Sequence, residues 1–403
     1  MLNRYAAAAV IAVLSSSAQA GTLEDCKQGA DLDLSVKACS RLIRDTSKDA
    51  ALFILRGNAY ADRKDYSLAI ADLTKAIDLQ PSNAIAWNDR GSAYWHINED
   101  EKALADFSKS IELDAKSALA FTNRGLTQAR KLDYASAIED YNKAIELNAK
   151  YTDALNGRGL AYEARGDHSL AIKDYDKVLS LDSHFASAYY NRAQTYGALG
   201  ELDRAIEDYD KAIEEKATDE DAYADRARLY VKKKNFVRAI ADFKRALDLN
   251  PGFVGALLDR GNAYLDNDKP DEAIADYNKV IGLDARNGAA YRGRAVAFHN
   301  LGILDRAMAD YSKAIEIDAK DSNALNNRAM VLLKTGKIVE ALADAERAVI
   351  LDGLDSTKLD TRGQVYEALG RKTDAIADYR KALKLNPNES GSSEGLKRLG
   401  AST

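Results

Sequence analysis

The sequence has few cysteines and histidines, two residue types that often serve in catalytic and metal sites, and few prolines. Its 403 residues include two cysteines, four histidines and four prolines, and the histidines fall in separate parts of the chain at no ligand spacing. No glycine-rich loop would cradle a phosphate, and the only basic run is Lys232-Lys233-Lys234. The net charge of −6 argues against nucleic acid as the main partner. We therefore expect a protein that is not an enzyme and needs no cofactor or metal.

Long hydrophobic runs are also missing. The one strongly apolar stretch, Tyr5–Leu14, is about half as long as a membrane span requires. Arg4 precedes it and Ala18-Gln19-Ala20 follows it, which is the pattern of a secretory signal peptide with its cleavage site. We predict that residues 1–20 are removed before Gly21, so that the mature chain is exported, either periplasmic or secreted, with no membrane span.

The most prominent feature of the sequence is one unbroken repeat period. An arginine recurs every 34 residues without insertion or deletion, and a period of this length is typical of repeat architectures. Gly or Ala follows each arginine, an Ala comes twelve residues later, and two further positions are mostly aromatic. The ten arginines are Arg56, Arg90, Arg124, Arg158, Arg192, Arg226, Arg260, Arg294, Arg328 and Arg362.

The apolar spacing within each period is helical. The apolar residues of 69–77 follow the pattern of a helix with one buried face, and Phe53, Gly57 and Tyr60 do the same in the preceding segment. Half of the intervening turns contain glycine, which suits the left-handed residue that ends a helix. No segment alternates with period two, so we expect no strand. Each unit is then a pair of helices that buries its apolar faces only by stacking on its neighbours.

This unit resembles the tetratricopeptide repeat. The resemblance rests on large, small and aromatic residues in the order Trp87, Gly91, Tyr94, Ala103 and Phe107, with matching positions in the other units. It implies an all-α, right-handed superhelical solenoid of ten helix-turn-helix repeats with capping helices at both ends. It also implies a protein that binds other proteins through its concave surface.

The regular period defines the domain boundaries. After the signal peptide we predict an N-terminal capping hairpin over residues 21–49 and a C-terminal cap and tail over residues 390–403. The ten repeats between them are 50–83, 84–117, 118–151, 152–185, 186–219, 220–253, 254–287, 288–321, 322–355 and 356–389.

A charge pair accompanies every repeat, because an aspartate follows each arginine sixteen residues later, from Asp72 to Asp378. The arginines could form an anion-binding stripe, or each could pair with its aspartate on the other helix. The matched number favours the structural pair. A weaker alternative pairs the aspartate with the Lys or Arg three residues further on, as in Asp106 and Lys109.

The position just before each arginine is polar in most repeats and, by the resemblance, lines the concave surface. Amides there offer both a donor and an acceptor to an extended peptide backbone, although the column could also be a solvated helix face. The predicted groove residues, including amides at neighbouring positions, are Asn88, Asp89, Asn123, Asn156, Asn191, Asp225, Asp259, Asn262, Asn326 and Asn327. Because three of them are acidic, basic or neutral segments are expected to bind better than acidic ones.

Several functions remain open at this stage. The leading interpretation is a non-enzymatic scaffold that binds a protein or peptide partner in its groove. The alternative is a structural or assembly component of an envelope or secretion complex that docks through its ends or self-associates. A regulatory subunit of a separate enzyme is a third possibility. The motif Gly391-Ser392-Ser393-Glu394-Gly395 has the pattern of a nucleophile elbow, but no histidine follows it to act as a base.

The two cysteines fall in the N-terminal cap. Extending the repeat backwards places Cys26 and Cys39 at core positions of a truncated unit, on short helices near residues 23–29 and 33–45. Since disulfides persist in exported proteins, we predict that these two cysteines form one. Two buried free thiols are the alternative, and two ligands are too few for a metal site.

Overall fold

The chain folds entirely into helices over the residues that a computed structural model describes, 17–402. Residues 1–16, and with them most of the predicted signal peptide, lie outside this range. The chain divides into two compact units, residues 1–215 and 216–403, each of which we describe by itself. No strand occurs in either unit within the described range, and no helix there is long and apolar enough to cross a bilayer.

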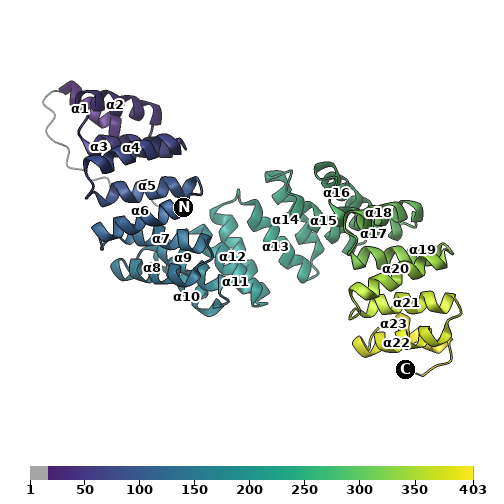
Figure 1. The fold of residues 1–403 in the computed structure, drawn as a ribbon. Coiled ribbons are helices and arrows are strands. Elements are labelled where there is room, and N and C mark those ends of the chain that lie inside the picture. Colours follow the sequence, from purple (N-terminus) through teal and green to yellow (C-terminus); the bar gives the residue numbers. More distant parts are fainter. Residues whose placement is uncertain (1–16, 403) are drawn as a thin grey trace. The chain divides into compact units, whose positions relative to one another are not determined.

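In the first unit the helices follow one another in pairs (Figure 1). They are α1 (Ser17–Lys27), α2 (Leu32–Asp45), α3 (Ala50–Asp62), α4 (Tyr66–Leu79), α5 (Ala84–His96), α6 (Asp100–Leu113), α7 (Ala118–Arg130), α8 (Tyr134–Leu147), α9 (Thr152–Ala164), α10 (His168–Leu181), α11 (Ala186–Ala198) and α12 (Leu202–Glu215).

The second unit continues the same alternation (Figure 1). Its helices are α13 (Glu220–Lys232), α14 (Phe236–Leu249), α15 (Val254–Asp266), α16 (Pro270–Leu283), α17 (Gly288–Asn300), α18 (Leu304–Ile317), α19 (Ser322–Lys334), α20 (Ile338–Leu351), α21 (Ser356–Ala368), α22 (Lys372–Leu385) and α23 (Ser390–Arg398).

The predicted repeat is confirmed as an all-α arrangement of paired helices. The odd-numbered helices from α3 to α21, which we call the first helices, each pack most extensively on the even-numbered second helix that follows. The first helices begin at the predicted repeat starts, from Ala50 to Ser356. The right-handed superhelical twist stays a prediction.

The small residues of the repeat allow the two helices of a pair to approach closely. A Cβ atom on Gly91 would lie 2.9 Å from the ring of Phe107, and one on Gly159 would lie 2.6 Å from the ring of Tyr175. Side chains larger than hydrogen would therefore push these rings out of the core.

Every turn between paired helices contains a residue in the left-handed conformation. Five of these residues are glycines, as the sequence indicated. The other five carry side chains, and Leu132 (φ 65°) and Asp268 (φ 55°) are among them. Asp268 thus belongs to a helix-ending turn, and no cluster of three or more potential metal ligands occurs in the part of the chain that the structure describes.

The two ends of the repeat array are capped differently. At the N-terminus, α1 and α2 form the predicted hairpin, although α1 begins at Ser17, before residue 23. In the structure Cys26 and Cys39 form a disulfide with a Cα–Cα distance of 4.9 Å. Both cysteines are at most 3 % exposed and pack against Leu42 and Leu52.

At the C-terminus, α23 occupies the place of one more first helix and packs on α21 and α22. The buried Ser392 hydroxyl donates a hydrogen bond of 2.7 Å to Asp360. A Cβ atom on Gly391 would lie 2.6 Å from the same carboxylate, and one on Gly395 would overlap the ring of Tyr379. The small residues of the elbow-like motif therefore serve helix packing.

Candidate functional site

The repeated arginine pairs with the repeated aspartate in all ten repeats, as predicted. The guanidinium lies on the first helix, and its Nε and Nη2 atoms donate to the two carboxylate oxygens on the second helix of the same repeat, as in Arg90 and Asp106. The shortest N–O distance is 2.6 or 2.7 Å in every repeat. The hydrogen bond to Asp106 raises the pKa of Arg90 even though burial opposes the shift. Because the carboxylate already occupies two nitrogens, the column is structural.

The third nitrogen of the guanidinium reaches the preceding repeat, which the sequence reasoning missed. Nη1 of Arg90 donates to Thr74, Nη1 of Arg158 to Asn142 and Nη1 of Arg328 to Ser312, at 2.6–3.1 Å. These acceptors stand on the second helix of the repeat before. One arginine therefore ties together three helices of two successive repeats, and a recurring polar residue sixteen positions earlier was the available signal.

The residues beside these arginines line two grooves, one in each unit. The unit-1 groove, of about 340 Å³, spans α7, α9 and α11, and the unit-2 groove, of about 670 Å³, spans α15, α17 and α19. The unit-1 groove is lined by Thr122, Asn123, Leu126, Tyr141, Tyr151, Asp153, Asn156, Gly157, Leu160, Phe185 and Ser187. The unit-2 groove is lined by Leu258, Asp259, Asn262, Leu265, Asp266, Ala289, Arg292, Gly293, Val296, Asn300, Asn323 and Asn327.

Five of the ten predicted groove residues line these grooves: Asn123, Asn156, Asp259, Asn262 and Asn327. The other five line neither groove and are Asn88, Asp89, Asn191, Asp225 and Asn326.

Several of the predicted amides bond to one another between first helices. Asn123 donates to the Oδ1 atom of Asn88, and Asn191 donates to the Oδ1 atom of Asn156, both at 3.0 Å. Asn123 is 2 % exposed and Asn191 is 8 % exposed. These two amides hold neighbouring repeats together. Asn156 lines the groove itself and is only half-buried.

The acidic members of the set have partners within their own unit. Arg228 contacts both Asp225 and Asp259, at 2.5 and 2.7 Å. Asp89 accepts hydrogen bonds from Asn58 at 2.9 Å and from Asn88 at 3.2 Å. The acidic part of the column is thus fixed in position by neighbouring side chains.

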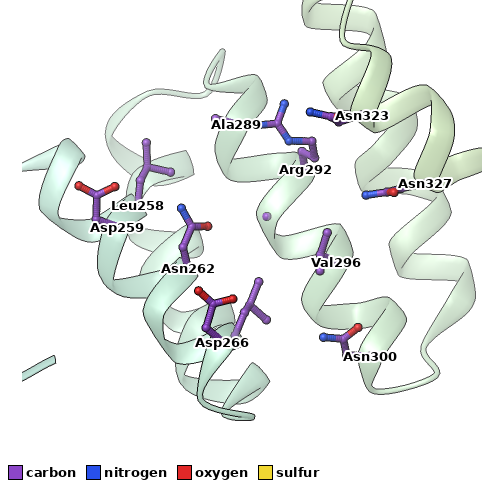
Figure 2. A pocket seen from close by; sticks show the side chains of 12 residues that line it. Leu258, Asp259, Asn262, Asp266, Ala289, Arg292, Val296, Asn300, Asn323 and Asn327 are labelled. Carbon is purple, nitrogen blue, oxygen red and sulfur yellow. The ribbon is translucent and has the colours of Figure 1, made fainter. Parts of the chain in front are cut away.

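The unit-2 groove presents a mostly polar wall (Figure 2). Asp259, Asn262 and Asp266 stand on α15, and Arg292 and Asn300 on α17 face them. Asn323 and Asn327 continue the wall on α19. Exposed amides on all three helices can therefore meet one ligand.

A tyrosine hydroxyl lies under this groove. Tyr277 donates a hydrogen bond of 2.7 Å to the Oδ1 atom of Asn262. Burial raises the pKa of Tyr277, and the charges of Asp266 and Asp276 raise it further, so the phenol stays protonated and acts as a donor. Arg292 forms an ion pair with Asp321, which offsets its charge locally.

Two glutamates that occupy the same place in their repeats differ in environment. Burial raises the pKa of Glu163, which accepts a hydrogen bond from Tyr175 at 3.4 Å. The hydrogen bond from Arg398 lowers the pKa of Glu367, which also accepts one from Tyr379 at 2.7 Å. Arg398 contacts Glu367 through two nitrogens, at 2.9 and 3.0 Å, and so anchors α23.

Comparison with known proteins identifies the repeat. Family models described as tetratricopeptide repeat or TPR repeat match residues 57–98, 84–117, 133–166, 152–185, 186–219, 220–253, 258–323, 311–343 and 361–389. The chain belongs to the tetratricopeptide repeat family. No curated protein sequence matches it.

Solved structures share the tetratricopeptide repeat fold at low identity. A tetratricopeptide repeat protein from Parabacteroides merdae is 21 % identical with a TM-score of 0.53, and the match covers 62 % of this chain and 98 % of the other. The Cut9 and Hcn1 hetero-tetramer of the APC/C is 13 % identical with a TM-score of 0.52, and the match covers 94 % and 95 %. The fold is that of a scaffold for protein–protein interaction, and proteins of this family are typically not enzymes.

Residues of the predicted column line both grooves, but the sequence reasoning passed over two members of that column. Gly157 and Gly293 stand in this column, one in each groove, and they were passed over because they carry no polar group. Arg292 and Asp266 were also missed. Their signal was their spacing, since Arg292 directly precedes Gly293 and Asp266 lies seven residues, about two turns, after Asp259 on the same helix.

Proposed function

We propose that this tetratricopeptide repeat protein binds an extended segment of a protein partner in the grooves formed by its first helices. The observation that carries the proposal is the unit-2 groove, where amides and charged groups from the first helices of three successive repeats line one depression. The lining supplies hydrogen-bond donors and acceptors and charged groups, which can recognise a peptide by hydrogen bonds, charge and shape.

The amides fit a peptide backbone. Asn262, Asn300 and Asn323 are exposed, and each amide offers donors and an acceptor. Neighbouring packed helices lie about 8–10 Å apart, so three of them span about 20 Å. An extended chain rises about 3.3 Å per residue, so about six residues fill the groove.

We also propose that the protein acts outside the cytoplasm. The pattern of residues 1–20 and the Cys26–Cys39 disulfide support export, because disulfides persist in oxidising compartments. Pulse labelling followed by fractionation tests this: a shorter, exported chain is expected, and an uncut cytoplasmic chain contradicts it.

The groove is tested by capture of partners from the exported fraction. Purified full chain and a variant with Asn262, Asn323 and Asn327 changed to Ala serve as baits, and Asn388→Ala, an exposed amide in a loop, serves as the control. We expect the triple variant to lose partners that the control retains. Equal capture by all three baits contradicts groove binding.

Retention of partners by the triple variant favours the assembly role instead. One feature of the surface supports that candidate: Ile350, in the last turn of α20, and Leu354, in the turn after it, are each 80 % exposed. The preceding repeat has Glu316 and Lys320 at the same places. Ile350→Lys with Leu354→Lys is then expected to remove the partners instead.

A further inference from the structure

Each of the two grooves is formed by three successive first helices, and the middle helix of each has an unusual residue, a glycine in the column before the arginine. Gly157 and Gly293 lie four repeats apart. A Cβ atom on Gly157 would lie 2.9 Å from the hydroxyl oxygen of Tyr141, and one on Gly293 would lie 2.9 Å from that of Tyr277. The tyrosine ring therefore occupies the place of a Cβ atom, so each of these positions requires glycine, and the backbone there lines the groove without a side chain. We call this side-chain-free part of each groove wall the glycine gap.

The repeat that follows each glycine has an asparagine in the same column, Asn191 and Asn327. Tyr311, which stands where Tyr277 stands one repeat earlier, lies near Asn327. Other repeats therefore carry a side chain in this column. Among the ten repeats only those of Gly157 and Gly293 have glycine there, so the gap is a property of these two grooves.

The walls around the two gaps differ in chemistry. In the unit-1 groove Leu126, Tyr151, Leu160 and Phe185 give an apolar lining, and Leu160 is 41 % exposed. An apolar side chain of a ligand that enters the gap above Gly157 meets these groups and leaves water.

The unit-2 groove has polar groups at corresponding places. Asn262 stands where Leu126 stands in unit 1, and Asp321 stands where Phe185 stands. The groove and its border hold the carboxylates of Asp259, Asp266 and Asp321 against the guanidiniums of Arg228 and Arg292. The excess of negative charge favours a cationic side chain above Gly293.

We propose that the two glycine gaps are side-chain subsites of unlike specificity: the unit-1 groove takes an apolar side chain of an extended peptide, and the unit-2 groove takes a lysine or arginine side chain. The proposal rests on the proposed function, because it assigns specificity to the same grooves. A partner with both kinds of segment, or two partners, is then recognised by different repeats of one chain.

The test selects ligands from a displayed library of random peptides about eight residues long, a little longer than a groove. The baits are the full chain, Gly157→Asn and Gly293→Asn, each variant serving as the matched control for the other. We expect two families of sequences, one apolar and one basic. Gly157→Asn should weaken the apolar family about tenfold or more and leave the basic family within about twofold, and Gly293→Asn should do the reverse.

Two further variants keep the test decisive if an added side chain disturbs folding. Leu160→Ser changes a part-exposed residue of the unit-1 wall and should weaken only the apolar family. Asp266→Asn removes an exposed carboxylate of the unit-2 wall. It should weaken only the basic family and reduce the dependence of its affinity on salt.

The outcomes separate the two proposals. Selected peptides that form a single family, or two families that respond to the same variant, overturn the unlike subsites while peptide binding in the grooves stands. Peptides that bind all variants equally well, or no enrichment over a bait-free control, reject groove binding as well.

Discussion

Replacing Arg260 by alanine tests whether the arginine–aspartate pairs hold the repeats together. Arg260 donates to both oxygens of Asp276 at 2.7 Å. The arginine side chain is 13 % exposed and the aspartate side chain is 3 % exposed. Removing the guanidinium leaves a buried carboxylate without its cation.

The expected cost is large because the remaining charge cannot reach water. Breaking one partner of a buried pair costs about 3–5 kcal/mol, whereas an exposed pair contributes about 0–1 kcal/mol. Lys109→Ala is the matched exposed control, since Lys109 and Glu112 are 39 % and 67 % exposed. The double replacement Arg260→Met with Asp276→Leu should recover most of the loss, because an apolar pair of similar volume removes the unpaired charge.

The assay combines urea unfolding, followed by circular dichroism, with hydrogen exchange of α15 and α16. Exchange is needed because repeat arrays unfold in parts, so one global free energy can hide a local loss. A cost below about 1 kcal/mol for Arg260→Ala, equal to that of Lys109→Ala, would refute the reasoning.

Three further predictions follow from the structure. Denatured, non-reduced protein should show no reactive thiol, and two reactive thiols per chain would contradict the disulfide. Cys39→Ser opens the short loop to Cys26 and should lower the stability of the N-terminal cap by about 3 kcal/mol. Leu132→Gly should raise stability by about 1 kcal/mol in thermal unfolding, because an exposed leucine at φ 65° is strained. Glu163→Gln should stabilise the protein at neutral pH: because the pKa of Glu163 is raised in the folded chain, its ionisation lowers the free energy of unfolding as pH rises above the ordinary value of 4.5. Glu367→Gln should destabilise the protein above pH 4.5 and not at lower pH: because the pKa of Glu367 is lowered, the stability that its charged form contributes is lost when acid protonates it. Urea unfolding from pH 3 to 8 measures the effect of each variant, and a change of the free energy of unfolding in the same direction for both variants at neutral pH contradicts the opposite pKa shifts.

Much of the fold could be predicted because the repeat presents the same evidence ten times. The spacing of Arg56 and Asp72 recurs without a gap, so a structural pair was the simplest account, and the bidentate geometry confirms it. The starts of the first helices were also predicted, since one period fixes all of them. The left-handed turn at Leu132 was not predicted, because tertiary packing there overrides the residue's own preference.

The site was predicted less well because contacts between repeats decide which amides remain accessible. Asn123 and Asn327 share one column and each lines a groove, yet Asn123 is buried and its amide bonds to Asn88, whereas Asn327 is only half-buried. The spacing of residues within one repeat does not show which side chains of the neighbouring repeat contact them. Gly157 and Gly293 were overlooked for a related reason: a missing side chain has meaning only once the ring beneath it is known.

The division between constant and variable positions leads to a last prediction. Successive helical residues point about 100° apart, so an arginine turned toward the second helix directs the preceding residue toward the groove. Substitutions of groove residues should therefore change the ligand specificity without changing the fold. Asn262→Leu gives the unit-2 groove the residue that Leu126 supplies in unit 1. The change removes the acceptor of the Tyr277 hydroxyl, so we expect a cost of about 1 kcal/mol. Binding of basic peptides above Gly293 should weaken and binding of apolar peptides should strengthen, measured by fluorescence anisotropy with peptides of both kinds. If the affinities for both peptides stay unchanged while stability falls, Asn262 supports the tyrosine alone and does not select the ligand.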